Sequence, residues 1–141
     1  MLRHRLMLAA ETLIRDGDSN NVSAITIFEE FTFAAFPYIV PRLMVLTVLE
    51  RDQDDADKFP LVLDITIAGQ SLASINFEID FQGLNRTRGL LFIGGMPIPQ
   101  PGTLRITVSH QGQELAHYDI EVKTSAKAEA RIIQPAQAPA G

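Results

Sequence analysis

Two histidines near the carboxyl end are the residues of this sequence whose types and spacing could do chemistry. His110 and His117 lie seven residues apart, with Glu114 and Asp119 beside them. An imidazole held by a carboxylate can serve as a general base or acid. The stretch 103–122 therefore raises one alternative function, a small hydrolase or isomerase that uses a His/carboxylate pair.

The same stretch has the pattern of a β-hairpin, whose register decides where the histidines point. A two-residue turn at 111–112 with no irregularity would place His117 opposite Ile106, inside the core. It would bury Asp119 as well, and burying an unpaired charge is expensive. A connection of odd length, or one bulge near Leu115, shifts the pairing by one residue and exchanges the two faces.

We predict the shifted register, because it keeps the charged groups in water. Its cross-strand pairs are Leu104 with Ile120, Ile106 with Tyr118, and Arg105 with Asp119. His117 is then a solvated strand residue beside Thr107, and His110 lies at the turn. His4 has no predicted partner, so none of the three histidines is predicted to be catalytic.

The most charged stretch, residues 51–58, raises a second alternative function. It carries four candidate metal ligands, Asp52, Asp54, Asp55 and Asp57. Oxygen-rich loops bind calcium, but an EF-hand also needs a glycine at its sixth position and a glutamate at its twelfth. Counted from Asp52, neither is present. We predict a solvated loop between two strands and no bound metal.

Other catalytic signatures are missing from the sequence. The chain has no cysteine, which excludes thiol catalysis and cysteine-ligated zinc. Gly94 and Gly95 lack the Lys-Ser/Thr of a phosphate-binding loop, and no serine lies in a G-x-S-x-G motif. Glu29 and Glu30 are adjacent, so a strand would point them to opposite faces. We therefore predict no enzymatic activity, no catalytic residue and no cofactor.

A cluster of aromatic residues could line a ligand pocket. Its members are Phe28, Phe31, Phe33, Phe36 and Tyr38. Aromatic side chains contribute large apolar areas to protein cores, and we predict that these five pack into the core. No binding residue is assigned.

The elements that must position these residues read as β-strands. Apolar residues alternate along 61–67 and along 73–81, with turn residues between them, which predicts an antiparallel pair. Segment 42–50 has apolar residues at both odd and even positions. It is therefore either a strand that is covered on both faces or a short buried helix. Its Val and Thr content, and Pro41 before it, favour the strand. Further strands are predicted at 5–14, 21–28 and 88–93 and in the two arms of the last hairpin.

Two proline-containing stretches are predicted to be connections. Residues 33–41 carry two prolines, which interrupt a hydrogen-bonded ladder. Residues 94–102 are rich in proline and glycine and are predicted to form a stiff crossover before the last hairpin.

About eight strands without an amphipathic helix define the fold class. A chain of 141 residues is one domain by length. We predict an all-β, single-domain antiparallel β-sandwich of the immunoglobulin-like kind over residues 1–124. Residues 125–141 are rich in alanine and proline and read as a tail.

Charge and hydropathy exclude several classes of partner. The net charge is -5 and no run of Lys and Arg occurs, so we expect neither nucleic acid nor an anionic membrane surface as a partner. No apolar run has the length of a membrane-spanning helix. We expect a cytoplasmic protein.

The first half of the chain, "HRLMLAAETLIRDGDSNNVSAITIFEEFTFAAFPYIVPRLMVLTVL", resembles a family of uncharacterised bacterial proteins, a domain of unknown function. In that family a strand like "LLLAD" precedes a turn, a second strand, a Phe-Pro stretch, a further proline and a long apolar strand. The family's end is similar to Pro101-Gly102, Gly112 and the "ELA" at 114–116 here.

The resemblance covers the chain to about Lys123. The sequence departs from the family at Ala10, where aspartate is common, and at 24–28, where glycine is common. The resemblance implies an all-β domain and brings no activity with it.

These observations predict a non-enzymatic β-sandwich that acts as a binding or assembly module. The chain lacks a coherent catalytic constellation and is 46% hydrophobic. We therefore expect a protein partner or a homo-oligomer. The hydrolase or isomerase and the calcium-binding domain stand as alternatives.

Overall fold

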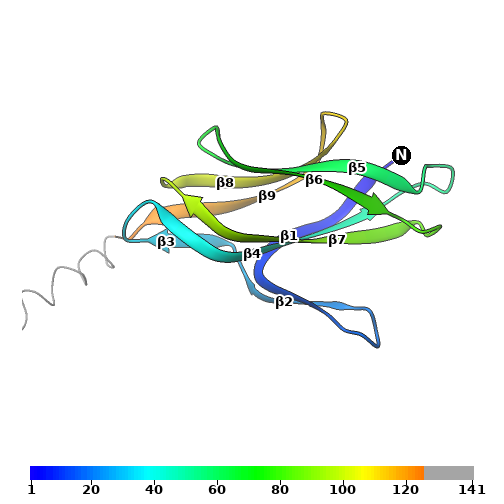
Figure 1. Ribbon diagram of the computed structural model, residues 1–141, viewed down its shortest axis with the longest axis horizontal. Helices are drawn as coiled ribbons and strands as arrows, with labels where there is room; N and C mark the ends of the chain where they lie inside the picture. Colours follow the sequence, from blue (N-terminus) through cyan, green and yellow to red (C-terminus); the bar gives the residue numbers. More distant parts are fainter. Residues whose placement is uncertain (126–141) are drawn as a thin grey trace, which may run out of the picture.

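Alternating apolar side chains build two β-sheets that face each other across one core (Figure 1). The computed structural model describes residues 1–125. Apart from Ser125, the predicted tail lies outside the described residues.

Nine strands occur within residues 1–125. They are β1 (Arg3–Arg15), β2 (Val22–Ile27), β3 (Glu30–Phe33), β4 (Tyr38–Glu50), β5 (Lys58–Ile67), β6 (Gln70–Asp80), β7 (Arg86–Ile98), β8 (Gly102–His110) and β9 (Gln113–Thr124). One sheet has the order β2-β1-β4-β7 and the other the order β3-β9-β8-β5-β6. The β3–β9 pair is parallel and the other pairs are antiparallel. The predicted all-β sandwich is confirmed, with nine strands instead of about eight and one parallel pair.

The predicted pair at 61–67 and 73–81 is confirmed as β5 and β6. Leu61, Leu63 and Ile65 of β5 are almost fully buried, because the pleat turns alternate residues toward the core. Ala68 and Gly69 join the strands with φ values of 48° and 79°, as the two-residue turns of twisted hairpins require.

Segment 42–50 is the strand that its β-branched residues predicted, and both faces of it are covered. Leu43, Val45 and Leu49 are fully buried in the core between the sheets. Leu46 points to the outer face and is only 6% exposed. It belongs to a second, smaller apolar cluster on the outside of the four-stranded sheet.

A hairpin covers that outer face. β1 pairs with β4 as far as Ala10 and beyond it only with β2, so residues 11–27 form a two-stranded arm. Leu13 and Ala24 lie on one face of the arm and pack with Leu46 in the second cluster. The Arg88 side chain of β7 donates hydrogen bonds to the carbonyl oxygen and the Oδ1 atom of Asn20 at the tip. In Figure 1 the arm projects below the two sheets, with its tip away from the core.

The two predicted proline-rich connections were wrong in extent. β4 begins at Tyr38 and includes Pro41, and β7 continues through Gly94 and Pro97 to Ile98. β4 pairs with β1 only from Met44 onward, so Pro41 lies outside that pairing. Pro97 lies in an edge strand. At both places one side of the strand has no paired neighbour, and prolines in sheets occur at such edges.

The shifted register of the last hairpin is confirmed. Leu104, Arg105 and Ile106 pair with Ile120, Asp119 and Tyr118. Gln111 and Gly112 form the turn with φ values of 52° and 78°. The ladder shifts after Val108, because Leu115 is the extra residue of a bulge.

Deleting Leu115 should leave the fold intact, because it removes the bulge without changing which residues of β8 and β9 face each other. We expect a loss of about 1–2 kcal/mol in the free energy of unfolding, from the partly buried leucine. Deleting Thr107 is the matched control, since it slips half of β8 against both neighbours and should abolish cooperative unfolding. Urea titration followed by circular dichroism measures both, and a Leu115 deletion as damaging as that of Thr107 would refute this role of the bulge.

Candidate functional site

The structure brings one histidine to a carboxylate, at the surface of the last hairpin. The Nδ1 atom of His117 lies 2.9 Å from Oε2 of Glu114, and the His117 side chain is 41% exposed. His117 faces outward opposite Thr107, as predicted. His110 flanks the turn, with its ring edge-on to Phe59 at 5.3 Å. The pair has the atoms for proton transfer, but the pockets described below are lined by other residues.

The acidic loop is held by cations from the same end of the sandwich. Asp52 accepts hydrogen bonds from the Met1 α-ammonium group at 2.5 Å and from Arg3 at 2.8 Å. These bonds lower the pKa of Asp52. Asp55 also accepts from the Met1 ammonium group, which lowers its pKa too. Asp54 is exposed. Within residues 1–125, no three His, Asp or Glu side chains are grouped so that they could hold a metal ion.

Arg51 ties this loop to the turn between β6 and β7. Its guanidinium group is buried and donates to the carbonyl oxygens of Leu84 at 2.8 Å and Asp55 at 3.0 Å. It forms an ion pair with Asp57 at 2.7 Å and lies over the Phe81 ring. Because two loops converge on one buried cation, Arg51 orders this end of the molecule.

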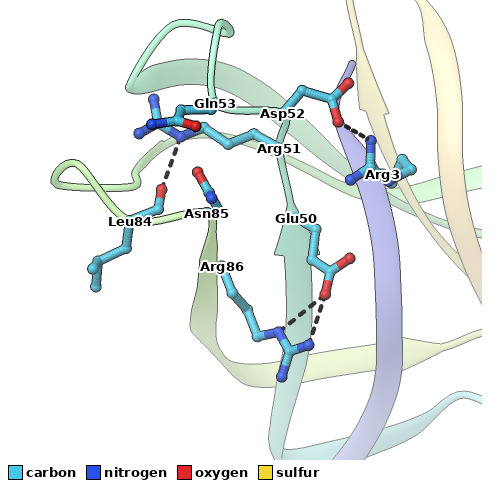
Figure 2. A pocket seen from close by; sticks show the side chains of 8 residues that line it. All are labelled: Arg3, Glu50, Arg51, Asp52, Gln53, Leu84, Asn85 and Arg86. Carbon is cyan, nitrogen blue, oxygen red and sulfur yellow. Dashed lines mark hydrogen bonds and ion pairs between the residues drawn. The ribbon is translucent and has the colours of Figure 1, made fainter.

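An open polar pocket of about 650 Å³ lies beside Arg51 (Figure 2). Its wall includes Arg3, Glu50, Arg51 and Arg86. Arg86 donates from Nε and Nη2 to one oxygen of Glu50, and Figure 2 shows the two hydrogen bonds across the mouth. These bonds lower the pKa of Glu50. The arginines are thus already engaged with carboxylates and carbonyls, which leaves the pocket little net charge to attract a ligand.

The aromatic cluster mainly builds the core, as predicted. Phe31 and Phe33 are buried, and Phe28 and Phe36 pack against the core. Tyr38 is 44% exposed and stacks on Phe33 with their ring centroids 3.9 Å apart. Part of the cluster borders an apolar pocket of about 410 Å³ at the base of the arm.

The arm carries exposed apolar side chains on its outer face. Ile14, Ile25 and Ile27 are each exposed by nearly half. The pairing of Thr12 with Ile25, and of Ile14 with Ser23, places the Ile14 and Ile25 side chains on one face. That face points away from the side that packs on the four-stranded sheet.

β2 also offers an unprotected sheet edge. An edge strand presents free N–H and C=O groups, and natural edges are blunted by charge, proline or short length. β2 spans Val22–Ile27 and has neither a charged residue nor a proline. The other edges carry such protection: β3 has four residues, β6 ends in Glu78 and Asp80, and β7 carries Arg86, Arg88 and Pro97.

Sequence reasoning placed β1 and β2 but missed this surface. The alternation at Ala24, Ile25, Thr26 and Ile27 was readable as a half-buried strand. The uncharged composition of 21–27 was the available signal, since an edge strand inside a stable monomer normally carries a protective residue.

Changing Arg51 tests how this end of the sandwich is held. We expect Arg51→Ala to cost about 2–3 kcal/mol of unfolding free energy, because two carbonyls lose a charged donor. Arg51→Lys should restore little, since one ammonium group cannot span the guanidinium's partners. Arg86→Ala, at a 59% exposed side chain, is the control and should cost less than about 1 kcal/mol. Thermal unfolding compares the three, and equal losses at Arg51 and Arg86 would contradict the assignment.

The Arg105–Asp119 pair should make stability depend on pH. Hydrogen bonds from Arg105 lower the pKa of Asp119, so the folded state favours the carboxylate. This contribution is present above the ordinary aspartate pKa of about 4 and is lost as the pH falls through the lower folded value. Asp119→Asn should therefore cost about 0.2–1 kcal/mol at pH 7 and nothing in strong acid.

Urea unfolding across the acid range measures that difference. Glu78→Gln is the control, because Glu78 makes no ion pair within residues 1–125. An Asp119→Asn penalty that persists in acid would refute an electrostatic origin.

In residues 1–125 no helix combines the length and the apolar character needed to cross a bilayer.

Comparisons with known proteins match the chain to a family without a described activity. No curated protein matches the sequence. Among solved structures, an immunoglobulin-like protein from Pseudomonas aeruginosa is similar at 14% identity and a TM-score of 0.45, over 86% of this chain and 96% of that chain. The model of the family of unknown function DUF6941 matches residues 7–123. This match confirms the resemblance found in the sequence, and the chain belongs to the family of unknown function DUF6941.

Proposed function

We propose that this domain is a protein-binding module that works without catalysis and takes an extended segment of a partner protein onto β2. The observation that carries the proposal is the edge of β2, which has one neighbour strand and no protective residue. Strand addition at such an edge supplies main-chain hydrogen bonds for affinity and side-chain contacts for specificity.

Only the regular part of β2, before its kink, can pair with an added strand. Thr26 has a φ of 58°, which kinks β2 near its end. An added strand would therefore run along Val22–Ile25. Its side chains on one face would cover Ile25 and reach toward Ile14, removing apolar surface from water.

The arm is suited to this role because one of its faces packs on the domain and the other stays exposed. The face with Leu13 and Ala24 anchors it to the four-stranded sheet. The face with the isoleucines stays available, as exposed apolar patches do at protein interaction sites. We assign no role to the His117–Glu114 pair, which belongs to the other sheet. The lack of cysteine agrees with a cytoplasmic setting, which is part of the proposal.

Selection of phage-displayed random peptides on the full chain tests the proposal. Selected peptides should share an alternating apolar pattern and bind Ile25→Lys at least about tenfold more weakly, because a charge then meets the added strand. Ile39→Lys is the matched control, since Ile39 is a 60% exposed strand isoleucine outside the arm. Binding to it should be unchanged. N-methylation of the selected peptides should abolish binding, because it removes their backbone donors.

Three outcomes would overturn the proposal. These are no enriched pattern, equal losses at Ile25→Lys and Ile39→Lys, or full binding by N-methylated peptides. Sedimentation velocity adds a fourth: a dimer of the unliganded protein that Ile25→Lys dissociates would show that a second copy occupies the edge.

A further inference from the structure

The charges around the edge of β2 say what kind of segment it would take. β2 itself is uncharged, but the chain carries Asp16 and Asp18 just before it and Glu29 and Glu30 just after it. Both ends of the edge are therefore flanked by carboxylates. This inference rests on the proposed function, because it concerns the partner of the same edge.

These four flanking carboxylates differ in whether a cation pairs with them. Glu30 forms an ion pair with Lys123 at 3.2 Å, and Asp16 accepts a hydrogen bond from the Ser19 hydroxyl at 2.5 Å. Within residues 1–125, neither the Asp18 nor the Glu29 side chain makes an ion pair. The Ser19 hydroxyl carries no charge, so Asp16 keeps its negative charge, as Asp18 and Glu29 do, and both ends of the edge stay negative.

Arg15, the one lysine or arginine within residues 11–27, does not cancel these charges. Arg15 has the strand parity of Leu13, whose face packs on the four-stranded sheet, and it lines a pocket there with Asn20 and Arg88. No ion pair within residues 1–125 joins Arg15 to Asp18 or Glu29, so both ends of the edge keep negative charge.

This charge pattern disfavours a second copy as the occupant. Two β2 strands paired antiparallel would bring the Asp18 end of one copy beside the Glu29 end of the other. Like charges placed opposite each other across strands are destabilising. A strand with basic residues at its ends would gain from the same positions.

We propose that β2 binds an extended segment of a partner protein that is apolar at alternate positions and carries lysine or arginine at both flanks. The apolar side chains cover the isoleucine face, and the basic flanks meet Asp18 and Glu29. The charges select the partner and its register, while the backbone hydrogen bonds and the apolar contacts hold it.

Three synthetic peptides with one common centre, Val-Thr-Ile-Thr-Val, test the inference on the full chain. They differ only in flanks of lysine, serine or glutamate, and fluorescence anisotropy gives their affinities. The lysine peptide should bind about tenfold or more tightly than the glutamate peptide at about 0.1 M salt, and the gap should shrink toward nothing at about 1 M salt. In D18N/E29Q the gap should fall to about threefold or less, because Asp16 is then the one flanking carboxylate without an ion pair within residues 1–125. The matched control D54N/E78Q changes two exposed carboxylates outside the arm and should keep the full gap.

The outcomes separate this inference from the proposed function. Equal binding of the lysine and glutamate peptides in the unchanged protein would overturn the inference and leave strand addition standing. A gap as large in D18N/E29Q as in the unchanged protein would also overturn it, because other charges would then be responsible. If none of the three peptides binds, strand addition at β2 fails together with the inference.

Discussion

The central strand β4 is apolar on both faces, and the need to cover both faces shapes the rest of the molecule. The inner side chains Leu43, Val45 and Leu49 are buried against the five-stranded sheet. The outer side chain Leu46 needs a second cover, which the arm of β1 and β2 provides. Because β1 leaves β4 after Ala10 to build this cover, β2 becomes the edge of its sheet. The surface proposed for binding is thus a consequence of burying β4.

The carboxylates of the acidic loop and those of the arm differ in their partners. At one end Arg51, Arg3 and the Met1 ammonium group neutralise the acidic loop and tie it to neighbouring segments. Around the arm, Asp18 and Glu29 have no such partners within residues 1–125. A cluster of carboxylates in the sequence therefore says little about function until the structure shows which cations face it. In this protein cations pair with the acidic loop, whereas Asp18 and Glu29 make no ion pair within residues 1–125.

Much of the fold could be read from local patterns, and the candidate site could not. The shifted register followed from the cost of burying His117 and Asp119, so one energetic argument placed both side chains in water, and the structure shows that a bulge at Leu115 produces the shift. The exposed face of Ile14 and Ile25 escaped the same reasoning, since a half-buried strand and a half-exposed arm have the same alternation. Only the packing of the opposite face on β4 tells them apart.

The sequence by itself determined the strands other than β3, and the register of the last hairpin, because alternation and turn chemistry act between residues that are close along the chain. The tertiary structure alone decided that β1 and β2 fold back over β4, that Pro41 and Pro97 sit inside strands, and that β3 pairs in parallel with the distant β9. Those features depend on contacts between segments far apart in sequence. Whether such segments meet depends on how much surface they bury together, and no single stretch of sequence carries that information.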